Sequence, residues 1–257
     1  MQDNAKNSKK GFVLRLIITA VSILLWLAIW ELAAYLIGYD FIFVGPIKTF
    51  TALCTLAGTL SFWQTVALSV LRILAGLALG ILLGVTLAIL CRALPIIITF
   101  VSVGMTVIRS TPVASIIMIL WIIVGSTSVP VVIAVLMVAP IIWQNLMDGY
   151  ESIDKDLREV TLVFNFSKRK AFVHLTLPTL LRYFVPAALT SVGLAWKSGI
   201  AAEIIAYTKN SIGKNVLDAK SYFEADVLLA WTVAVIVISL VFEYLVKYLV
   251  KRSKLWD

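Results

Sequence analysis

Charged residues are scarce in this chain: Asp, Glu, Lys and Arg make up 14% of its 257 residues, whereas 61% are hydrophobic. A typical soluble domain is about 25% charged and about 45–50% apolar, so the composition excludes that class. It indicates an all-α membrane protein with several spanning helices. The net charge of +8 could suggest nucleic-acid binding. However, Lys and Arg gather in alternate loops between apolar runs, which is the distribution expected of a membrane protein.

Residues that commonly carry catalysis or metals are also few: one His and two Cys. Cys54 and Cys91 fall in loops that we place on opposite sides of the membrane, so we expect neither a disulfide nor a metal site. A nucleotide-binding loop of the form G-x-x-x-x-G-K-S/T is missing, since Gly213-Lys214 is followed by Asn215. We therefore expect no enzymatic activity and no cofactor on this chain. Any nucleotide that this protein needs would have to bind another chain.

Six runs are apolar and long enough to span a bilayer core, which requires about 20 helical residues. The first is longer than the core of a signal peptide, so we interpret it as a retained span. Lys and Arg total fifteen on the side of the two termini and four in the opposite loops, which predicts cytoplasmic termini. The spans are expected at about 14–37, 65–90, 93–124, 129–147, 183–207 and 227–246, within a single transmembrane domain of residues 1–257.

The run from 93 to 124 is too long for one straight span. Its 32 residues would measure about 48 Å as a helix, but the hydrocarbon core is about 30 Å thick. The sequence Arg109-Ser110-Thr111-Pro112 is the natural break, because proline lacks a backbone donor and disfavours helix at the preceding residue. Non-helical backbone at this depth is tolerated only inside protein or beside water. Arg109 could contact an anionic substrate or donate to the broken backbone, and both alternatives stay open.

Charged side chains within spans are costly, so they indicate specific roles. We expect Glu31 and Arg72, near the outer ends of the first two spans, to form a structural ion pair. Lys197 follows Trp196 among small residues and is the best candidate to line a substrate pathway, with a buried pair to Glu31 as the alternative. Glu203, six residues further on, points to a different face and would be a structural charge. The candidate pathway residues are Arg109, Ser110, Thr111, Pro112, Trp196 and Lys197.

Three glycines recur every four residues in the second span: Gly76, Gly80 and Gly84. Such a stripe of small residues lets another helix approach closely. We favour packing inside one bundle over a contact between subunits.

Residues 148–182, which we call the docking segment, are the only long charged stretch between apolar runs, with six Lys/Arg and five carboxylates. The segment still has a helical pattern. Leu157, Val160, Thr161 and Phe164 are spaced i, i+3, i+4 and i+7, which places them on one face of a helix. An apolar stripe outside the membrane is typical of a helix that binds in the groove of a partner.

The ends of two short helices can be recognised in the docking segment. Asp154 is a suitable N-cap for the first. Asn165 would end it, and Ser167 could cap a second helix that runs to Pro178. Two short helices joined by a bend therefore hang between membrane spans.

The docking segment resembles the cytoplasmic loop of permeases from ATP-binding cassette (ABC) importers. That loop has the pattern E-A-A, three residues, Gly, nine residues, then I-x-L-P. Here Glu159-Val160-Thr161 stands at E-A-A, Asn165 at the Gly and Leu175-Thr176-Leu177-Pro178 at the end, with all spacings kept. Val and Thr replace the two Ala, Leu replaces Ile, and Asn replaces Gly, whose left-handed backbone Asn tolerates.

In that family the residue corresponding to Glu159 belongs to the ATPase contact. The resemblance thus implies an ATPase-coupling role for this part of the chain. The residues concerned are Leu157, Glu159, Val160, Thr161, Phe164, Asn165, Leu177 and Pro178.

The resemblance extends along the chain through SVLRILAGLALGILLG, RSTP and GLAWKSGIAAEII. The chain looks like a permease of the nitrate/sulfonate/taurine branch, which implies a type I importer fold with six spans and cytoplasmic coupling helices in the bacterial inner membrane. The implied partners are two ABC ATPase subunits, an extracytoplasmic binding protein and a second permease, which we expect to be a copy of this chain. The implied solute is small and anionic. The alternatives are a vitamin precursor (thiamine pyrimidine or riboflavin type) and a secondary transporter without an ATPase.

Overall fold

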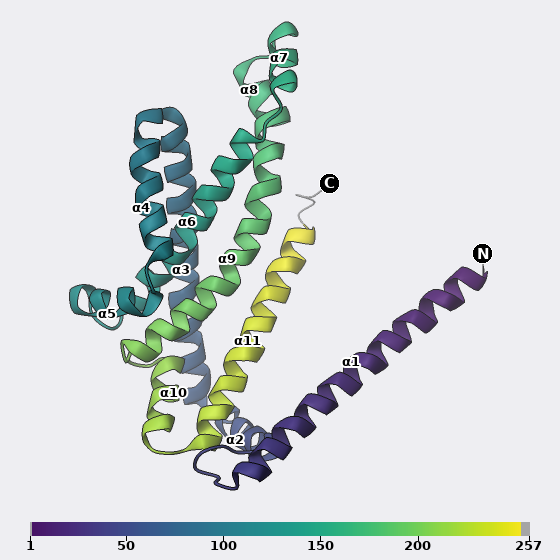
Figure 1. Ribbon diagram of the computed structural model, residues 1–257, viewed down its shortest axis with the longest axis vertical. Helices are drawn as coiled ribbons and strands as arrows, with labels where there is room; N and C mark the ends of the chain where they lie inside the picture. Colours follow the sequence, from purple (N-terminus) through teal and green to yellow (C-terminus); the bar gives the residue numbers. More distant parts are fainter. Residues whose placement is uncertain (1, 253–257) are drawn as a thin grey trace.

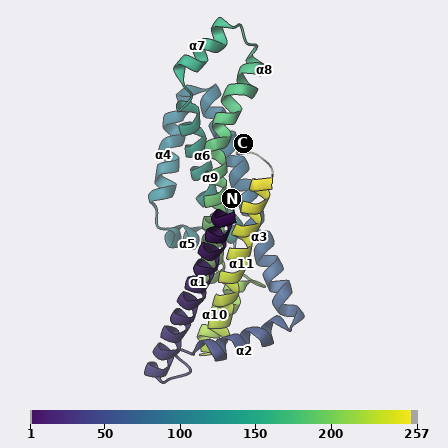
Figure 2. The ribbon, with the colours of Figure 1, turned by 90° about the vertical axis from the view of Figure 1, so that its right-hand side faces the viewer.

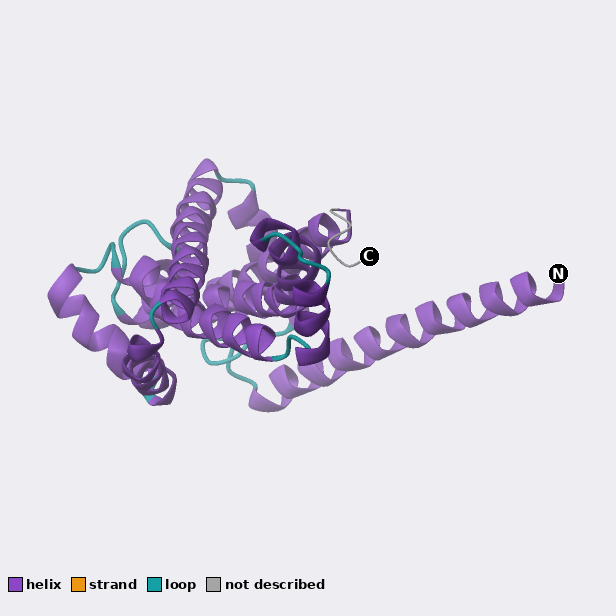
Figure 3. Ribbon diagram, turned by 90° about the horizontal axis from the view of Figure 1, so that it is seen from above, coloured by secondary structure: helices purple, strands orange, loops and turns teal. Residues whose placement is uncertain are grey.

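The computed structural model describes residues 2–252, and within that range every regular element is helical (Figure 3). The bounds are α1 Gln2–Ile37, α2 Pro46–Ala57, α3 Leu60–Ala93, the 3₁₀ turn η1 Pro95–Ile97, α4 Ile98–Ser110, α5 Val113–Val124, α6 Val129–Glu151, α7 Lys155–Val163, α8 Lys168–Ala171, the π-helical turn η2 Phe172–Thr176, α9 Leu177–Ile205, α10 Ile212–Ser221 and α11 Ala225–Arg252.

Five of these helices are long and apolar enough to cross a membrane, and α4 with α5 makes six if that bent pair counts as one span. The prediction of an all-α protein with six spans is therefore confirmed. Most helices extend beyond the predicted spans by several residues, most of all α1, which begins at Gln2. The polar loop before the last span contains the additional helix α10. We call it the outer loop, because the distribution of Lys and Arg predicts that it lies outside the cytoplasm.

Helices α3, α6 and α9 pack against one another and form the centre of the molecule. The glycines of α3 allow this contact. A Cβ at Gly76 would lie 2.5 Å from the Cβ of Ala134, and one at Gly84 would lie 2.7 Å from the carbonyl oxygen of Ala139. A Cβ at Gly80 would also lie against α6. The stripe of small residues thus packs inside one bundle, as predicted.

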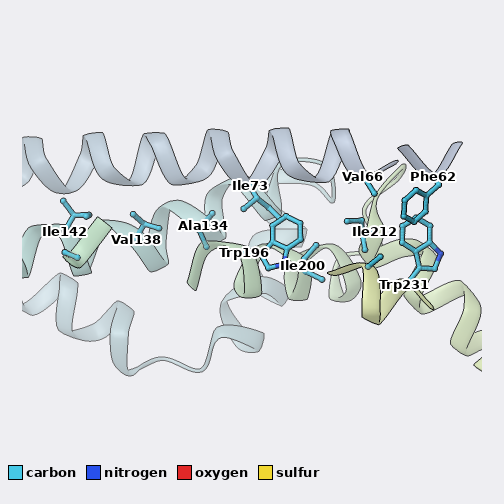
Figure 4. Packing of buried hydrophobic residues seen from close by; sticks show 13 residues of the cluster. Phe62, Val66, Ile73, Ala134, Val138, Ile142, Trp196, Ile200, Ile212 and Trp231 are labelled. Atoms are coloured by element: carbon cyan, nitrogen blue, oxygen red, sulfur yellow. The ribbon is translucent and has the colours of Figure 1, made fainter. Parts of the chain in front are cut away.

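The main core runs along α3 where it faces α6 and α9 (Figure 4). At its outer end the rings of Phe62 and Trp231 stack with centroids 4.8 Å apart. In its middle the indole of Trp196 lies beside Ile73 (Figure 4) and stacks on Phe242 at 5.8 Å. Because lipid is as apolar as these side chains, close packing rather than transfer out of water holds such helices together.

The third span is broken where the sequence predicts it. Helices α4 and α5 meet at an angle of 104°, and Thr111 between them has extended backbone with φ −80° and ψ 133°. In Figure 1, α4 runs beside α3, whereas α5 points sideways from the end of α4. Helix α5 packs on α6 and α9, where Ile117 is fully buried. The Thr208 hydroxyl donates to the Ser126 carbonyl at 2.7 Å and ties the loop after α5 to the outer end of α9.

Two parts of the chain stand away from this bundle. Helix α1 leaves it at an angle (Figure 1), and none of its apolar stretch within 17–37 is buried. Helices α7 and α8 form the tip at the opposite end from α2 (Figure 2). Both parts expose apolar side chains, so each has surface available to a partner or to lipid.

Candidate functional site

The tip formed by α7 is built by the local chemistry that the sequence predicts. The Asp154 carboxylate accepts from the backbone N–H of Asp156 at 2.8 Å and caps the helix. The apolar side chains of the stripe are exposed to between 45% and 69% of their surface: Leu157, Val160 and Phe164. Glu159 is exposed between them. An apolar stripe this open, on a helix outside the spans, is suited to bind in the groove of another protein.

The turn after α7 is also as predicted. Asn165 has a φ of +50°, the left-handed conformation that Asn tolerates better than most residues. The Ser167 hydroxyl accepts from the backbone N–H of Lys170 at 3.3 Å and caps α8.

The end of the second docking helix was predicted wrongly. It does not stop at Pro178, because α8, the π-helical turn η2 and α9 form one continuous helix from Lys168 to Ile205. Pro178 occupies the first turn of α9, and the wider turn Phe172–Thr176 immediately precedes it. Proline has no N–H to donate and its ring crowds the preceding turn of the helix, and a wider turn at this place makes room for it. The tip is therefore joined to the central span by a continuous helix. Leu177 and Pro178 lie in this helix, directly after the π-helical turn.

The break between α4 and α5 is held by hydroxyl groups. The hydroxyls of Ser110 and Thr111 donate to the carbonyl of Val107 at 3.1 and 2.7 Å, and Pro112 follows with extended backbone. Arg109 does not donate to this backbone, contrary to one of the two alternatives. Its guanidinium lies 3.5 Å from the Gln144 amide oxygen on α6 and is otherwise exposed.

Lys197 and Trp196 lie in different surroundings, although they are neighbours on α9. Lys197 is exposed and lines a groove between α9 and α11. The indole of Trp196 is 3% exposed and donates to the Val235 carbonyl at 3.2 Å. The structure therefore assigns Trp196 to the core rather than to a solute pathway, whereas Lys197 remains a candidate.

The expected ion pair between Glu31 and Arg72 is absent, and Arg72 instead faces Glu203. Their closest charged atoms are 3.7 Å apart. The guanidinium also donates to the carbonyls of Lys209 and Asn210 at 3.2 and 3.1 Å. The Glu31 carboxylate lies against Gly45 at the start of α2, where the helix dipole favours a negative charge.

Glu203 is completely buried at the outer end of α9. Its carboxylate accepts from the Ser69 hydroxyl at 2.9 Å and from the backbone N–H of Gly213 at 3.2 Å. The Ser69 hydroxyl in turn accepts from the backbone N–H of Ile212 at 3.0 Å. This cluster fastens the start of α10 to α3 and α9, and with Arg72 it positions the outer loop.

Several of these groups were missed by sequence reasoning. Ser69 is one of many serines, and nothing in its neighbourhood marks it as a partner of a residue 134 positions away. Glu243 and Lys247 on α11 could have been noticed, because charges four residues apart in an apolar helix indicate a function. Among residues 2–252 no group of three or more His, Cys, Asp or Glu is arranged to hold a metal ion.

Comparison with known proteins decides the family. Residues 76–255 match the family described as the binding-protein-dependent transport system inner membrane component. The chain belongs to this family. It is 24% identical to the taurine transport system permease protein TauC of Escherichia coli, over 92% of this chain and 87% of that protein.

Two further relatives belong to other transport systems. The putative aliphatic sulfonates transport permease protein SsuC of Escherichia coli is 27% identical over 78% of this chain and 77% of its own length. The bicarbonate transport system permease protein CmpB of Synechocystis is 27% identical, over 66% of this chain and 61% of its own length.

A solved structure shares the fold. It is the crystal structure of a bacterial ABC transporter involved in the import of the acidic polysaccharide alginate, with a TM-score of 0.59 over 91% of this chain and 95% of that chain. Its sequence is 16% identical. The chain is thus a multi-pass permease subunit of an ABC importer, with the fold and family that the docking segment predicts.

Proposed function

We propose that the permease works as two copies of this chain with two separate ATPase subunits and an extracytoplasmic binding protein. One observation carries the proposal: the exposed apolar stripe of α7 at the end of the molecule, which needs a protein partner. The chain has no nucleotide-binding loop, so ATP and Mg²⁺ would be bound by that partner. Each copy offers one such stripe, and two ATPases require two.

The tip must lie in the cytoplasm for this assignment. The distribution of Lys and Arg supports that side, since fifteen lie with the tip and the termini and four lie in the opposite loops. The outer end of the molecule then carries α2 and α10, where a binding protein would deliver the solute.

The solute that fits best is a small molecule with an oxyanion group. The relatives named above are permeases for taurine, aliphatic sulfonates and bicarbonate, each of which carries such a group. Arg109 and Lys197, both exposed side chains within the spans, supply positive charge that would suit it. The same relatives do not favour the vitamin-precursor alternative.

Transport would proceed by alternating access. ATP would bring the two ATPases together, the α7 tips would move with them, and each continuous helix from Lys168 to Ile205 would carry the movement into the membrane. The bound ATP supplies the free energy, and this chain supplies the route and the mechanical link.

The assembly can be tested by purifying the tagged permease together with its ATPase and measuring the native mass. Two copies of each chain are expected. A stable single permease chain that transports solute without nucleotide would contradict the proposal.

The role of the tip has a sharper test in the double variant Glu159→Lys, Phe164→Ala. Loss of an interfacial charge with one partner left unpaired typically costs about 2–5 kcal/mol, which would abolish or greatly weaken ATPase binding. Glu151→Lys, an exposed charge reversal at the end of α6, is the matched control and should bind normally. Normal ATPase binding and transport by the double variant would show that α7 is not the coupling element.

A further inference from the structure

One face of α9 stays exposed although the rest of this central helix is covered by α3, α6 and α11. Its exposed residues recur at helical spacing: Arg182, Pro186, Thr190 and Lys197. They are polar, charged or proline residues, unlike the exposed side chains of α1, which are almost all apolar. A polar face on a central membrane helix is expected beside water or protein rather than beside hydrocarbon.

Helix α11 adds charged side chains to this face. The Glu243 carboxylate reaches across to α9, where a Cβ at Gly193 would lie 3.4 Å from it. Lys247, one turn further along α11, has its ammonium group 3.4 Å from the other carboxylate oxygen. With Thr190 and Lys197 these residues line a groove between α9 and α11 of about 430 Å³.

The groove carries an excess of positive charge. It holds two ammonium groups and one carboxylate, and the carboxylate is paired with Lys247. Among residues 2–252 no carboxylate forms an ion pair with Lys197. The Thr190 hydroxyl donates to the Pro186 carbonyl at 3.0 Å, so its oxygen can act only as an acceptor toward the groove. Lys197 is therefore the group in the groove that lacks a counter-charge.

We propose that this groove is a binding site for a small oxyanion, a sulfonate or carboxylate, with the Lys197 ammonium as its counter-charge. The inference rests on the proposed function only in placing the groove on the solute route. An ammonium is a compact charge without the fixed fork of arginine, so it accepts oxyanions of different shape. Because Glu243 and Lys247 neutralise each other, the net charge of the groove is +1. An anion would therefore bind weakly enough to leave again, as transport requires.

The test uses charged thiol reagents on the full-length permease and needs neither ATPase nor binding protein. Thr190→Cys is combined with Cys54→Ser, because Cys54 is exposed, whereas Cys91 is buried and is kept. The rates of modification by a sulfonatoethyl and by a trimethylammonioethyl methanethiosulfonate are compared. Cys54 in the otherwise unchanged chain gives the reference ratio for an exposed thiol.

The ratio of the modification rates, sulfonate over ammonium reagent, should be roughly tenfold higher at Thr190→Cys than at Cys54. The reason is that the Lys197 ammonium acts from nearby in a partly dehydrated groove. Added ethanesulfonate should slow the reaction. Lys197→Met, or Lys197→Gln if the first variant does not fold, should return the ratio to that of Cys54.

Equal ratios in the presence of Lys197, or no reaction with either reagent while Cys54 reacts, would overturn the anion site. The second result would mean that lipid or a second protein chain covers the groove. Neither result bears on ATPase binding by the α7 tip, so failure of the anion site and failure of the proposed function can be told apart.

Discussion

Glu203 shows how one buried charge can organise a loop in this permease. A buried carboxylate is costly unless hydrogen bonds and a counter-charge compensate it. Here Ser69 and Arg72 on α3 and the backbone of Gly213 at the start of α10 supply them. The residue is therefore a structural charge that positions the outer loop rather than a solute contact.

We predict that Glu203→Ala loosens the outer loop. Removing one partner of a buried pair typically costs about 3–5 kcal/mol, because the groups left behind lose their acceptor. The thermal unfolding temperature should fall, and protease cleavage within residues 206–224 should become faster. Glu224→Ala, which removes an exposed carboxylate from the same loop, is the control. Equal behaviour of the two variants would show that the buried cluster does not hold the loop.

A second charged cluster, the pair Lys214 and Asp218 on α10, makes the stability of the fold depend on pH. The hydrogen bond from Lys214 lowers the pKa of the Asp218 carboxyl below its usual 3.8, and the bond to Asp218 raises the pKa of Lys214 above its usual 10.5. The lowered pKa means that the pair stabilises the fold above pH 3.8 and that this contribution is lost as the pH falls through the folded value. The raised pKa gives the corresponding loss only above pH 10.5.

We therefore expect wild type and Asp218→Asn to differ in unfolding temperature by a small, constant amount across the neutral range. The difference should shrink in strong acid, where the carboxyl of the wild type is protonated. Unfolding temperatures measured at a series of pH values test this. A difference that changes near neutral pH would mean that another group titrates in the cluster.

At the level of helices, close packing against α6 is the function of the glycines in α3. We predict that Gly84→Ala destabilises the permease by about 1–3 kcal/mol, because the added methyl group meets backbone that cannot move aside. Gly104→Ala makes the same change on α4, where a Cβ would have no atom within 4 Å. That control should gain up to about 1 kcal/mol from helix propensity. Unfolding in detergent compares the two, and equal effects would contradict the packing argument.

Much of the helical arrangement could be predicted because it depends on local patterns. Apolar runs predict the spans, Thr111-Pro112 predicts the break, and Asp154 and Asn165 predict the ends of α7. The pairing of Arg72 with Glu203 could not be predicted, since nothing in one sequence says which distant charges meet. Pro178 misled for a different reason. Proline ends many helices, and only the structure shows that here a π-helical turn lets the helix continue through it.

The whole molecule joins two exposed features through one rigid element. The α7 tip lies at one end (Figure 1), the groove at Lys197 lies on the exposed face of α9, and the helix from Lys168 to Ile205 connects them. A continuous helix transmits displacement over its length, whereas a hinge would absorb it. The π-helical turn is the weakest part of this link, because its hydrogen bonding is irregular.

We predict that glycine at this turn uncouples ATP hydrolysis from transport. In Leu175→Gly, Thr176→Gly each glycine costs about 1 kcal/mol of helix stability relative to alanine, so the turn should bend where the native helix is stiff. The α7 stripe is untouched, and the ATPase should therefore still bind and hydrolyse ATP at the basal rate. Solute uptake into proteoliposomes, measured with the binding protein, should fall roughly tenfold, which is the effect of about 1.4 kcal/mol. Leu175→Ala, Thr176→Ala removes the same side chains, keeps the helix and should transport far better. Equal uptake by the glycine and alanine variants would mean that the movement reaches the membrane by another path.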